Sequence, residues 1–254
     1  VGSHPFYRTA VTFSINKSDR VTAVSESLKQ TTYDMFDIHR EIEVVPNFID
    51  VRRYEERAAE PCNRSLMALQ SETIFTHVSN FRAVKRVEDV VEIFARVNAK
   101  HPSVLIMVGE GPERIKAERL AKERGVYAKV KFLGNSVEID KVLCMTDIFL
   151  LPSSEESFGL AALEAMANKT AIISSNAGGL PEVNIHGETG YVCNVGDVDT
   201  MSRYALELTE DTDKLLQFKK NALQAAKRFD LPVIVPLYER LYESAYASRH
   251  KNQD

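Results

Sequence analysis

Two glutamates, Glu156 and Glu164, have the residue types and the spacing that best fit a chemical role in this chain. Glu156 lies in the polar loop that follows the apolar run 148–151, and Gly159 then opens a run rich in Ala, Leu and Met that contains Glu164. Such residues favour a helix, and a helix that is apolar on nearly every face is normally buried. Because a buried carboxylate is costly unless hydrogen-bond donors face it, Glu164 requires a partner.

The order of strand, polar loop and helix start predicts an anion site between the two glutamates. Free backbone N–H groups and the positive end of the helix dipole point outward at such a helix start. An anionic ligand that also carries hydroxyl groups would satisfy both the amides and the carboxylates, and a nucleotide sugar has both features. The alternative is that Glu164 reaches solvent along the helix edge and that Glu156 is a first-turn carboxylate favoured by the dipole. This stretch alone leaves both interpretations open.

Three cations, Arg82, Lys85 and Arg86, follow an earlier apolar segment. Arg has a planar fork that matches phosphate, and Lys is a mobile point charge. Cations at a helix start oppose the helix dipole, so we interpret them as phosphate ligands and not as a solvated helix end. The glycine-rich stretch 109–112 lacks the third glycine of a dinucleotide-binding loop.

Metal and nucleophile motifs are weak. The stretches 197–199 and 211–213 match the Asp-x-Asp of metal-dependent sugar transferases, but each precedes a predicted helix, where Asp is a favoured cap. The histidines form no metal spacing, and we interpret His77, inside a predicted strand, as a hydrogen-bonded core residue. No Ser or Cys sits in a nucleophile elbow. We therefore expect no metal and no cofactor.

The elements that must position these residues alternate between strand and helix. This alternation predicts an α/β fold with a doubly wound parallel sheet, in which ligands bind outside the carboxyl ends of the strands. The predicted strands are 73–79, 104–108, 130–133, 148–151, 170–174 and 191–195, with helices at 87–100, 199–208, 211–227 and from about 232 to 248. The loops expected at the carboxyl ends are 80–86, 109–112, 134–137 and 155–159.

The order of elements also predicts how the chain divides. Residues 1–50 read as helix, strand, helix and strand, with Ser25 as a helix N-cap, and are too short to bury a core alone. We interpret them as the end of a larger domain, and the chain as an excised fragment. The predicted boundaries place an irregular, charged linker at 51–71, a ligand-binding domain at 72–228 and a final helix at 229–254.

Composition excludes several classes of protein. The 254 residues are 44% hydrophobic and 27% charged, as in an ordinary globular protein, and the net charge of -4 argues against a general nucleic-acid binder. No apolar run approaches the ~20 residues of a membrane span, and no secretory signal opens the chain. Cys62, Cys144 and Cys193 are scattered and odd in number, which argues against a disulfide framework or zinc site and favours the cytoplasm.

Several motifs together resemble a known family. The Glu156–Glu164 spacing encloses Ser-Phe-Gly-Leu, and the motifs Gly-Gly-Leu-Pro-Glu at 178–182 and Gly-Glu-Thr-Gly-Tyr at 187–191 follow it. This order resembles the donor-binding half of family 4 glycosyltransferases of the GT-B fold, over residues 21–246. More narrowly, three stretches resemble the N-acetylglucosaminyl malate synthases of bacillithiol biosynthesis: residues 18–25, 46–50 and 77–86.

The resemblance implies a role for each matching residue. Arg82 and Lys85 would bind the donor diphosphate, although many members have Gly-Arg where this chain has Ser79-Asn80. Glu156 would hold sugar hydroxyls, and Glu164 the ribose hydroxyls. The implied catalytic residues are Glu156, Arg82 and Lys85; the implied donor-binding residues are Asn80, Arg86, Asn135, Val137, Ser157, Phe158, Gly159, Leu160 and Glu164.

The resemblance also implies an activity. It is the retaining, metal-independent transfer of a sugar, N-acetylglucosamine, from a UDP-sugar to a small acceptor, L-malate. Cations and a helix start would stabilise the charge that develops on the leaving diphosphate, and no second carboxylate stands where a covalent nucleophile would act. Residues 1–50 would then be the end of an acceptor domain, with Arg8 and residues 22–25 near the acceptor.

We expect this chain to bind the donor but to transfer sugar poorly, with a donor, an acceptor and no nucleic acid as partners. The formation of a homodimer is left open. The alternative function is a nucleotide-sugar-binding module without chemistry.

Overall fold

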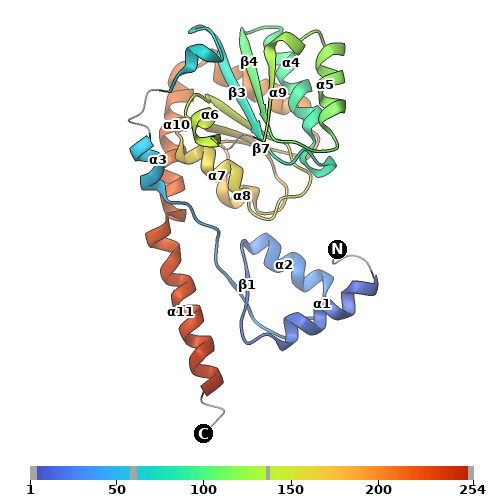
Figure 1. Ribbon diagram of the computed structural model, residues 1–254, viewed down its shortest axis with the longest axis vertical. Helices are drawn as coiled ribbons and strands as arrows, with labels where there is room; N and C mark the ends of the chain where they lie inside the picture. Colours follow the sequence, from blue (N-terminus) through green and yellow to red (C-terminus); the bar gives the residue numbers. More distant parts are fainter. Residues whose placement is uncertain (1–4, 58–61, 136–137, 251–254) are drawn as a thin grey trace. The chain divides into compact units, whose positions relative to one another are not determined.

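The chain folds into two units in the computed structural model, which describes residues 5–57, 62–135 and 138–250. The larger unit is Asp50–Arg228, and the smaller unit combines Val1–Ile49 with Phe229–Asp254 (Figure 1). Within the described residues no helix has both the length and the apolar character needed to cross a membrane.

A parallel sheet of six strands forms the centre of the larger unit in the part of the chain described. Its order is β5-β4-β3-β6-β7-β8, so the chain adds strands to one side of β3 and then returns to add strands to the other side. The predicted doubly wound sheet is thereby confirmed. The strands are β3 (Thr73–Val78), β4 (Ser103–Val108), β5 (Val130–Gly134), β6 (Ile148–Leu151), β7 (Ala171–Ser175) and β8 (Gly190–Cys193).

Helices cover both faces of this sheet, which is why the inner strands β4, β6 and β7 are buried along their whole length. On one face Phe75 and Leu105 pack in a core with α4 (Val87–Asn98), α5 (Arg114–Glu123) and α9 (Val198–Glu210). Their neighbours Ile74 and Ile106 point to the other face, toward α6 (Ile139–Leu143). The larger unit also contains α7 (Leu160–Ala167), α8 (Leu180–Val183), α10 (Thr212–Ala226) and η3 (Tyr127–Lys129). Helix α7 packs against β6, β7 and α10.

The predicted irregular linker is partly helical, which corrects that expectation. Residues 51–57 form α3 (Val51–Arg57), and a 3₁₀ turn, η1 (Arg64–Leu66), follows. Val51 and Tyr54 are buried, and their spacing of three residues places them on one face of the helix. Two apolar positions among many charged ones are too weak a pattern to recognise from sequence.

The Asp-x-Asp motifs cap helices, as predicted. The Asp197 carboxylate accepts a hydrogen bond from the backbone N–H of Thr200 at 3.0 Å, at the start of α9. Asp211 accepts one from the N–H of Lys214 at 2.9 Å, at the start of α10. Among the described residues, no group of three or more His, Cys, Asp or Glu side chains has metal-binding geometry.

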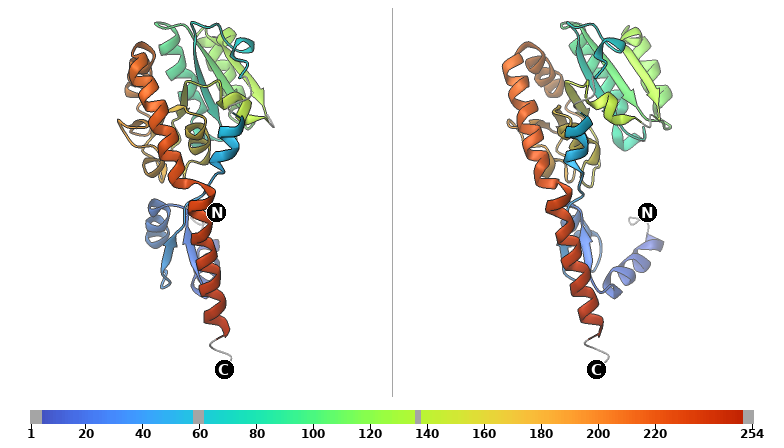
Figure 2. Two further views of the ribbon diagram at one scale, coloured as in Figure 1. Left: turned by 90° about the vertical axis from the view of Figure 1, so that its left-hand side faces the viewer. Right: turned by 60° about the vertical axis from the view of Figure 1, so that its left-hand side comes forward.

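The smaller unit contains a short parallel pair of strands, β1 (Val21–Ala23) and β2 (Ile42–Val44). Ser25 caps α2 (Glu26–Met35), because its hydroxyl accepts a hydrogen bond from the N–H of Leu28 at 3.0 Å. The long helix α11 (Leu231–His250) runs beside the strand pair (Figure 2), and Tyr238 packs edge-on against Phe48 there. The smaller unit also contains α1 (Pro5–Lys17). The short η4 (Lys227–Phe229) lies at the boundary of the two units in the sequence, just before α11.

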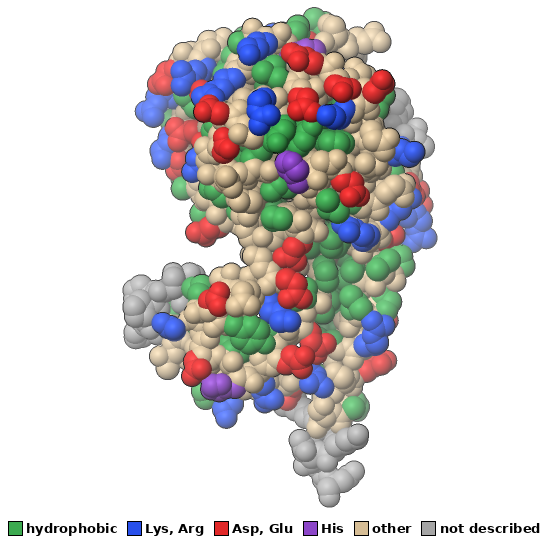
Figure 3. All heavy atoms as spheres, turned by 180° about the vertical axis from the view of Figure 1, so that it is seen from behind, with side chains coloured by type: hydrophobic (Ala, Val, Ile, Leu, Met, Phe, Trp, Pro, Cys, Tyr) green, Lys and Arg blue, Asp and Glu red, His purple; other side chains and the backbone are tan. Residues whose placement is uncertain are grey.

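Charged side chains of both signs are interspersed over the larger unit on the face drawn in Figure 3. A nucleic-acid surface instead gathers Lys and Arg into one patch or stripe. This face therefore has no broad basic surface of the kind that binds nucleic acid.

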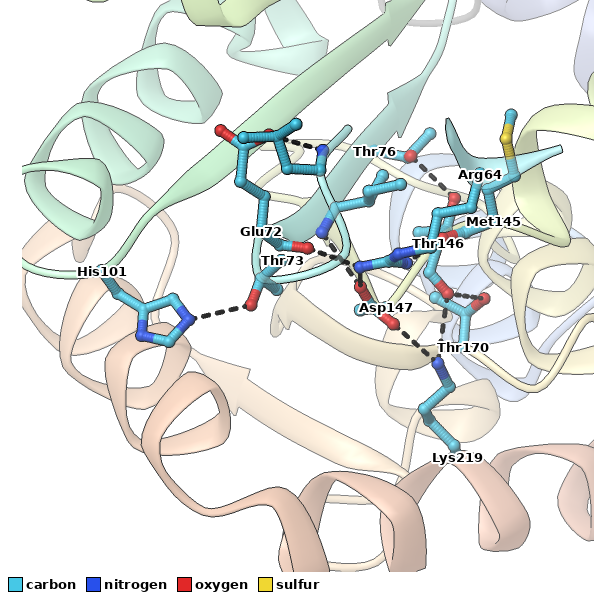
Figure 4. Close-up of polar contacts among 12 residues, drawn as sticks. Arg64, Glu72, Thr73, Thr76, His101, Met145, Thr146, Asp147, Thr170 and Lys219 are labelled. Carbon is cyan, nitrogen blue, oxygen red and sulfur yellow. Dashed lines mark hydrogen bonds and ion pairs between the residues drawn. The ribbon is translucent and has the colours of Figure 1, made fainter. Parts of the chain in front are cut away.

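Asp147 is the centre of a polar network at the amino-terminal edge of the sheet (Figure 4). Its carboxylate pairs with Arg64 at 2.8 Å and with Lys219 at 3.0 Å, and it accepts the N–H of Ile74 at 3.0 Å. Burial raises the pKa of Asp147, but Lys219, the Ile74 N–H and Arg64 outweigh it, so the pKa lies below the usual value. The network ties η1, β3, β6 and α10 together.

Cys62 and Cys144 form a disulfide with their Cα atoms 6.0 Å apart, so the expectation of no disulfide was wrong. Arg64 donates a hydrogen bond to the carbonyl oxygen of Met145 at 2.9 Å, which brings the segments of the two cysteines together. The cysteines are separated by 82 residues, so only the tertiary fold pairs them. Cys193 is free and buried.

Replacing Asp147 by Asn should destabilise the chain by about 2 kcal/mol at pH 7, since Arg64 and Lys219 would lose their charged partner. The pKa of Asp147 is lower in the folded than in the unfolded chain. Its charge therefore stabilises the fold above the unfolded pKa of about 3.9, and this stabilisation is lost as the pH falls through the folded-state pKa. Urea unfolding of the two proteins between pH 7 and pH 2 measures this.

The matched control for this change is Asp213→Asn, at an exposed carboxylate in the first turn of α10. It should change the free energy of unfolding by a few tenths of a kcal/mol. A difference between Asp147→Asn and the unsubstituted chain that stays constant down to pH 2 would contradict the role given to the Asp147 charge.

Candidate functional site

The candidate site lies where the strand order of the sheet reverses, between β3 and β6. These two strands are neighbours, and the next strands in the chain lie on opposite sides of them. In such sheets the crevice outside the carboxyl ends at the reversal is the usual ligand site. The loops that leave β3 and β6 meet there, because the N–H of Ser154 donates a hydrogen bond to the carbonyl of Val84 at 2.8 Å.

Lys85 and Glu156 form the closest contact across this crevice. The Lys85 Nζ donates to the Glu156 carboxylate at 2.5 Å, and the two side chains are 19% and 17% exposed. One predicted cation and one predicted carboxylate therefore meet, although they are far apart in the sequence. A mostly buried ion pair at a ligand crevice is a group of charges that a polar ligand can rearrange.

The glycine pair after β7 holds the backbone of Glu156. The N–H of Gly179 donates to the Glu156 carbonyl at 3.0 Å. A Cβ atom at Gly178 would lie 1.9 Å from the same oxygen, and the φ of Gly178 is +52°, so only glycine fits there. The motif Gly-Gly-Leu-Pro-Glu thus supports the position of the first glutamate.

Helix α7 starts beside Glu156 and carries Glu164. It begins after Gly159, whose φ is +101° and which, as a glycine, has no side chain that could cap the first N–H groups. This φ favours glycine, and a Cβ there would also lie 2.6 Å from the end of the Leu180 side chain on α8, which would have to shift. The α7 start therefore presents backbone donors next to the Lys85–Glu156 pair.

Glu164 is half-buried in the middle of α7, between the buried residues Leu163 and Ala165. Burial raises its pKa, and the charge of Arg53 on α3 partly offsets this. Within the described parts of the chain, no donor lies within hydrogen-bond distance of its carboxylate. The requirement for a partner that the sequence indicated therefore remains in the structure.

The other two predicted cations differ from Lys85. Arg82 is exposed at the start of η2 (Ala83–Lys85), and no acidic side chain among the described residues pairs with it. The Arg86 guanidinium donates to Asp89 at 2.7 Å, so one acid of α4 already engages it. Of the three predicted cations, Lys85 thus pairs with the Glu156 carboxylate, Arg82 is exposed at the surface, and Arg86 pairs with Asp89.

The remaining predicted donor-binding residues that the structure describes lie after β3, β5 and β6. Asn80 and Asn135 are exposed after β3 and β5, and Ser157 and Leu160 are exposed around the α7 start. Phe158 and Gly159 are buried, so they offer backbone rather than side-chain surface. Val137 lies outside the described residues.

His77 is fully buried at the end of β3 and fully hydrogen-bonded, as predicted for a core histidine. Its Nδ1 lies 2.8 Å from the Leu150 carbonyl oxygen, and its Nε2 lies 2.7 Å from the Ser79 hydroxyl. Burial lowers the pKa of His77 to about 4, the Leu150 carbonyl opposes this shift, and Lys85 adds to it. The ring is therefore neutral at pH 7.

Sequence reasoning missed the residues that shape the loop after β3. Ser79 accepts a hydrogen bond from the Phe81 N–H at 3.2 Å, and Phe81 has an unusual φ of 37°. A Cβ at Gly109 would lie 1.7 Å from the Ser79 carbonyl oxygen, and one at Gly111 would lie 2.1 Å from that of Asn80. Two glycines directly after a strand were the available signal of this close approach.

Comparison with known proteins places these features in a family. Residues 64–225 match the family model of glycosyl transferases group 1. The chain is 39% identical over 243 residues to the N-acetyl-alpha-D-glucosaminyl L-malate synthase of Bacillus anthracis, which covers 95% of this chain and 64% of that protein. It is 28% identical to a D-inositol 3-phosphate glycosyltransferase of Corynebacterium kroppenstedtii, covering 91% of this chain and 54% of that one.

Solved structures show the same fold. The Anabaena protein HepE, in complex with UDP and glucose, superposes with a TM-score of 0.81 at 22% identity, covering 94% of this chain and 66% of that one. The predicted GT-B type of fold is confirmed. The chain spans 64% and 54% of the lengths of the two curated relatives named above. The family match covers well over half of the chain, which therefore belongs to the glycosyl transferases group 1 family.

Proposed function

We propose that this chain is the donor-binding part of a glycosyltransferase that moves a sugar from a UDP-sugar to a small acceptor. The observation that carries the proposal is the contact of Lys85 with Glu156 at the reversal of the strand order, next to the start of α7 at Gly159. A cation, a carboxylate and free N–H groups together match the diphosphate and the hydroxyls of a nucleotide sugar.

The proposed roles follow from the chemistry of each group. Lys85 would move from Glu156 to the diphosphate, and the exposed Arg82 would approach the same phosphates. Glu156, released from Lys85, would accept hydrogen bonds from the sugar hydroxyls. Two cations and a helix start would stabilise the leaving diphosphate without a metal ion.

Glu164 would accept hydrogen bonds from the ribose hydroxyls. Burial of an unpartnered carboxylate is unfavourable, and two hydroxyl donors would supply the missing hydrogen bonds. The further donor contacts proposed are those of Asn80, Arg86, Asn135, Val137, Ser157, Phe158, Gly159 and Leu160.

The donor sugar and acceptor of the proposal come from similarity. The relative at 39% identity is named for N-acetylglucosamine and L-malate, and we propose the same pair here, with retention of configuration. The choice of UDP is supported by the similar structure of HepE, which holds UDP and glucose. Because the chain spans 64% of that relative, we expect donor binding without efficient transfer from this chain alone.

Calorimetric titration of the chain with UDP, ADP, GDP and uridine tests the proposal. UDP should bind at least about tenfold more tightly than uridine, about 1.4 kcal/mol, because only UDP has a diphosphate for Lys85 and Arg82. Adding a chelator should leave the UDP affinity unchanged. If none of the nucleotides binds, or if binding requires a divalent metal, the proposal is wrong.

Replacing Glu164 by Ala should weaken UDP binding about tenfold, because charged hydrogen bonds to the ribose would be lost. The same substitution should leave the weaker affinity for 2′,3′-dideoxy-UDP unchanged, since that nucleotide lacks both hydroxyls. The matched control is Glu155→Ala, at an exposed glutamate in the same loop. Equal losses for the two nucleotides would remove Glu164 from the ribose site.

A cytoplasmic location is part of the proposal, and the Cys62–Cys144 disulfide is the observation against it, because disulfides are rare in the reducing cytosol. Alkylation of thiols in freshly lysed cells, followed by mass spectrometry, measures the state of the pair. We expect Cys62 and Cys144 to be reduced and alkylated there, and oxidised in the purified protein. An oxidised pair in the lysed cells would contradict the proposed location.

A further inference from the structure

We propose that His77 and Ser79 form a positioning relay that holds the loop after β3 so that Lys85 meets the donor diphosphate. The inference rests on the proposed function and assigns to these residues a role in it. Neither residue is proposed to touch the donor: His77 is buried, and Ser79 acts through the backbone of Phe81.

The hydrogen bonds of the relay have one consistent direction. The Leu150 carbonyl can only accept, so the His77 Nδ1 must carry the proton of this 2.8 Å contact. In a neutral ring Nε2 is then an acceptor, so the Ser79 hydroxyl donates to it at 2.7 Å. The Ser79 oxygen is left to accept the N–H of Phe81 at 3.2 Å. These three hydrogen bonds therefore have compatible donors and acceptors.

The surroundings of His77 keep the ring neutral and fixed. Phe81 and Phe149 stack near the ring, with centroids 6.0 and 6.5 Å from it. Burial, and to a smaller extent the Lys85 charge, disfavours a second proton, and this lowers the pKa of His77. A charged imidazole would place an N–H against the Ser79 hydroxyl and force that hydroxyl to turn away. The Ser79 proton would then lose its acceptor, so the neutral ring is the state in which every group of the relay is paired.

The relay acts on the least favourable point of the loop. Phe81 has a φ of 37°, which is uncommon for a bulky residue, and its side chain is fully buried. Its N–H is held by Ser79, and its carbonyl accepts the N–H of Glu113 at 3.0 Å. The chain leaves this clamped residue through η2 and reaches Lys85 four positions later. Loss of the relay would remove the hydrogen bond that holds the Phe81 N–H. The turn that sets the direction of Lys85 would then be less constrained.

The His77 ring also connects the two strands whose following loops carry Lys85 and Glu156. His77 lies on β3, whose following loop carries Lys85, and it donates to Leu150 on β6, whose following loop carries Glu156. The relay thus joins the two strand ends beneath the crevice. Loss of the relay should weaken the binding of ligands whose phosphates contact Lys85. It should leave unchanged the binding of ligands that consist of base and ribose alone.

The test compares Ser79→Ala with Ser79→Thr in calorimetric titrations with UDP and with uridine. Ser79→Ala removes the bridging hydroxyl and should weaken UDP binding about fivefold to tenfold, with uridine affinity unchanged. Ser79→Thr keeps the hydroxyl and should restore UDP affinity to within about twofold of the unsubstituted chain. The matched control is Thr76→Val, on the same strand as His77. It removes the buried hydrogen bond between the hydroxyls of Thr76 and Thr146 and should weaken the binding of neither ligand.

A second measurement remains valid even where a variant folds poorly. Nitrogen-15 NMR of the unsubstituted chain, with the His77 signals assigned by their loss in His77→Gln, should show a neutral ring protonated at Nδ1 from pH 5 to pH 8. A ring protonated at Nε2, or charged at pH 7, would overturn the relay. So would a Ser79→Ala protein that binds UDP normally or loses UDP and uridine equally. Failure of the unsubstituted chain to bind UDP would instead contradict the proposed function.

Discussion

The ion pair of Lys85 with Glu156 is the interaction on which the candidate site depends. It joins two loops that come from neighbouring strands but lie 71 residues apart in the chain. It forms because the sheet reverses its order between β3 and β6, so that both loops leave the same edge. The glycine pair at 178–179 fixes the backbone of one partner, and the turn at Phe81 sets the path to the other. The site is therefore a product of strand order first and of side chains second.

Much of this arrangement could be predicted from sequence, since it follows from local patterns. Apolar runs located the strands, because a parallel sheet covered on both faces buries nearly every residue of its inner strands. Asp197 and Asp211 were recognised as caps because their position before a helix is a local feature. The apolar surroundings of Glu164 left a buried and a solvent-reaching carboxylate open; the residue is half-buried, and burial raises its pKa. In each case the cause lies within a few residues of its effect.

The features that were missed depend on contacts between distant segments. The Cys62–Cys144 disulfide joins positions that only the folded chain brings together, and no spacing encodes it. The pairing of Arg86 with Asp89 is the local exception, because the two residues are only three positions apart. His77 was recognised as a core residue, yet its bond to Leu150 required knowing that β3 and β6 are neighbours. Helix α3 was missed for a weaker reason, because two apolar residues among charges are not a readable period.

The energetics of the Lys85–Glu156 pair argue that it serves a ligand more than it serves the fold. Both side chains are mostly buried, and the desolvation of two charges offsets most of their attraction. A well-packed apolar pair of similar volume would be about as stabilising, so the pair is weak evidence of a structural role. Its charges have a use if a ligand rearranges them: a diphosphate replaces the carboxylate beside Lys85, and hydroxyl groups replace the ammonium beside Glu156. Under the proposed function, the ion pair would keep each charge hydrogen-bonded before the donor binds, so that neither group is buried without a partner.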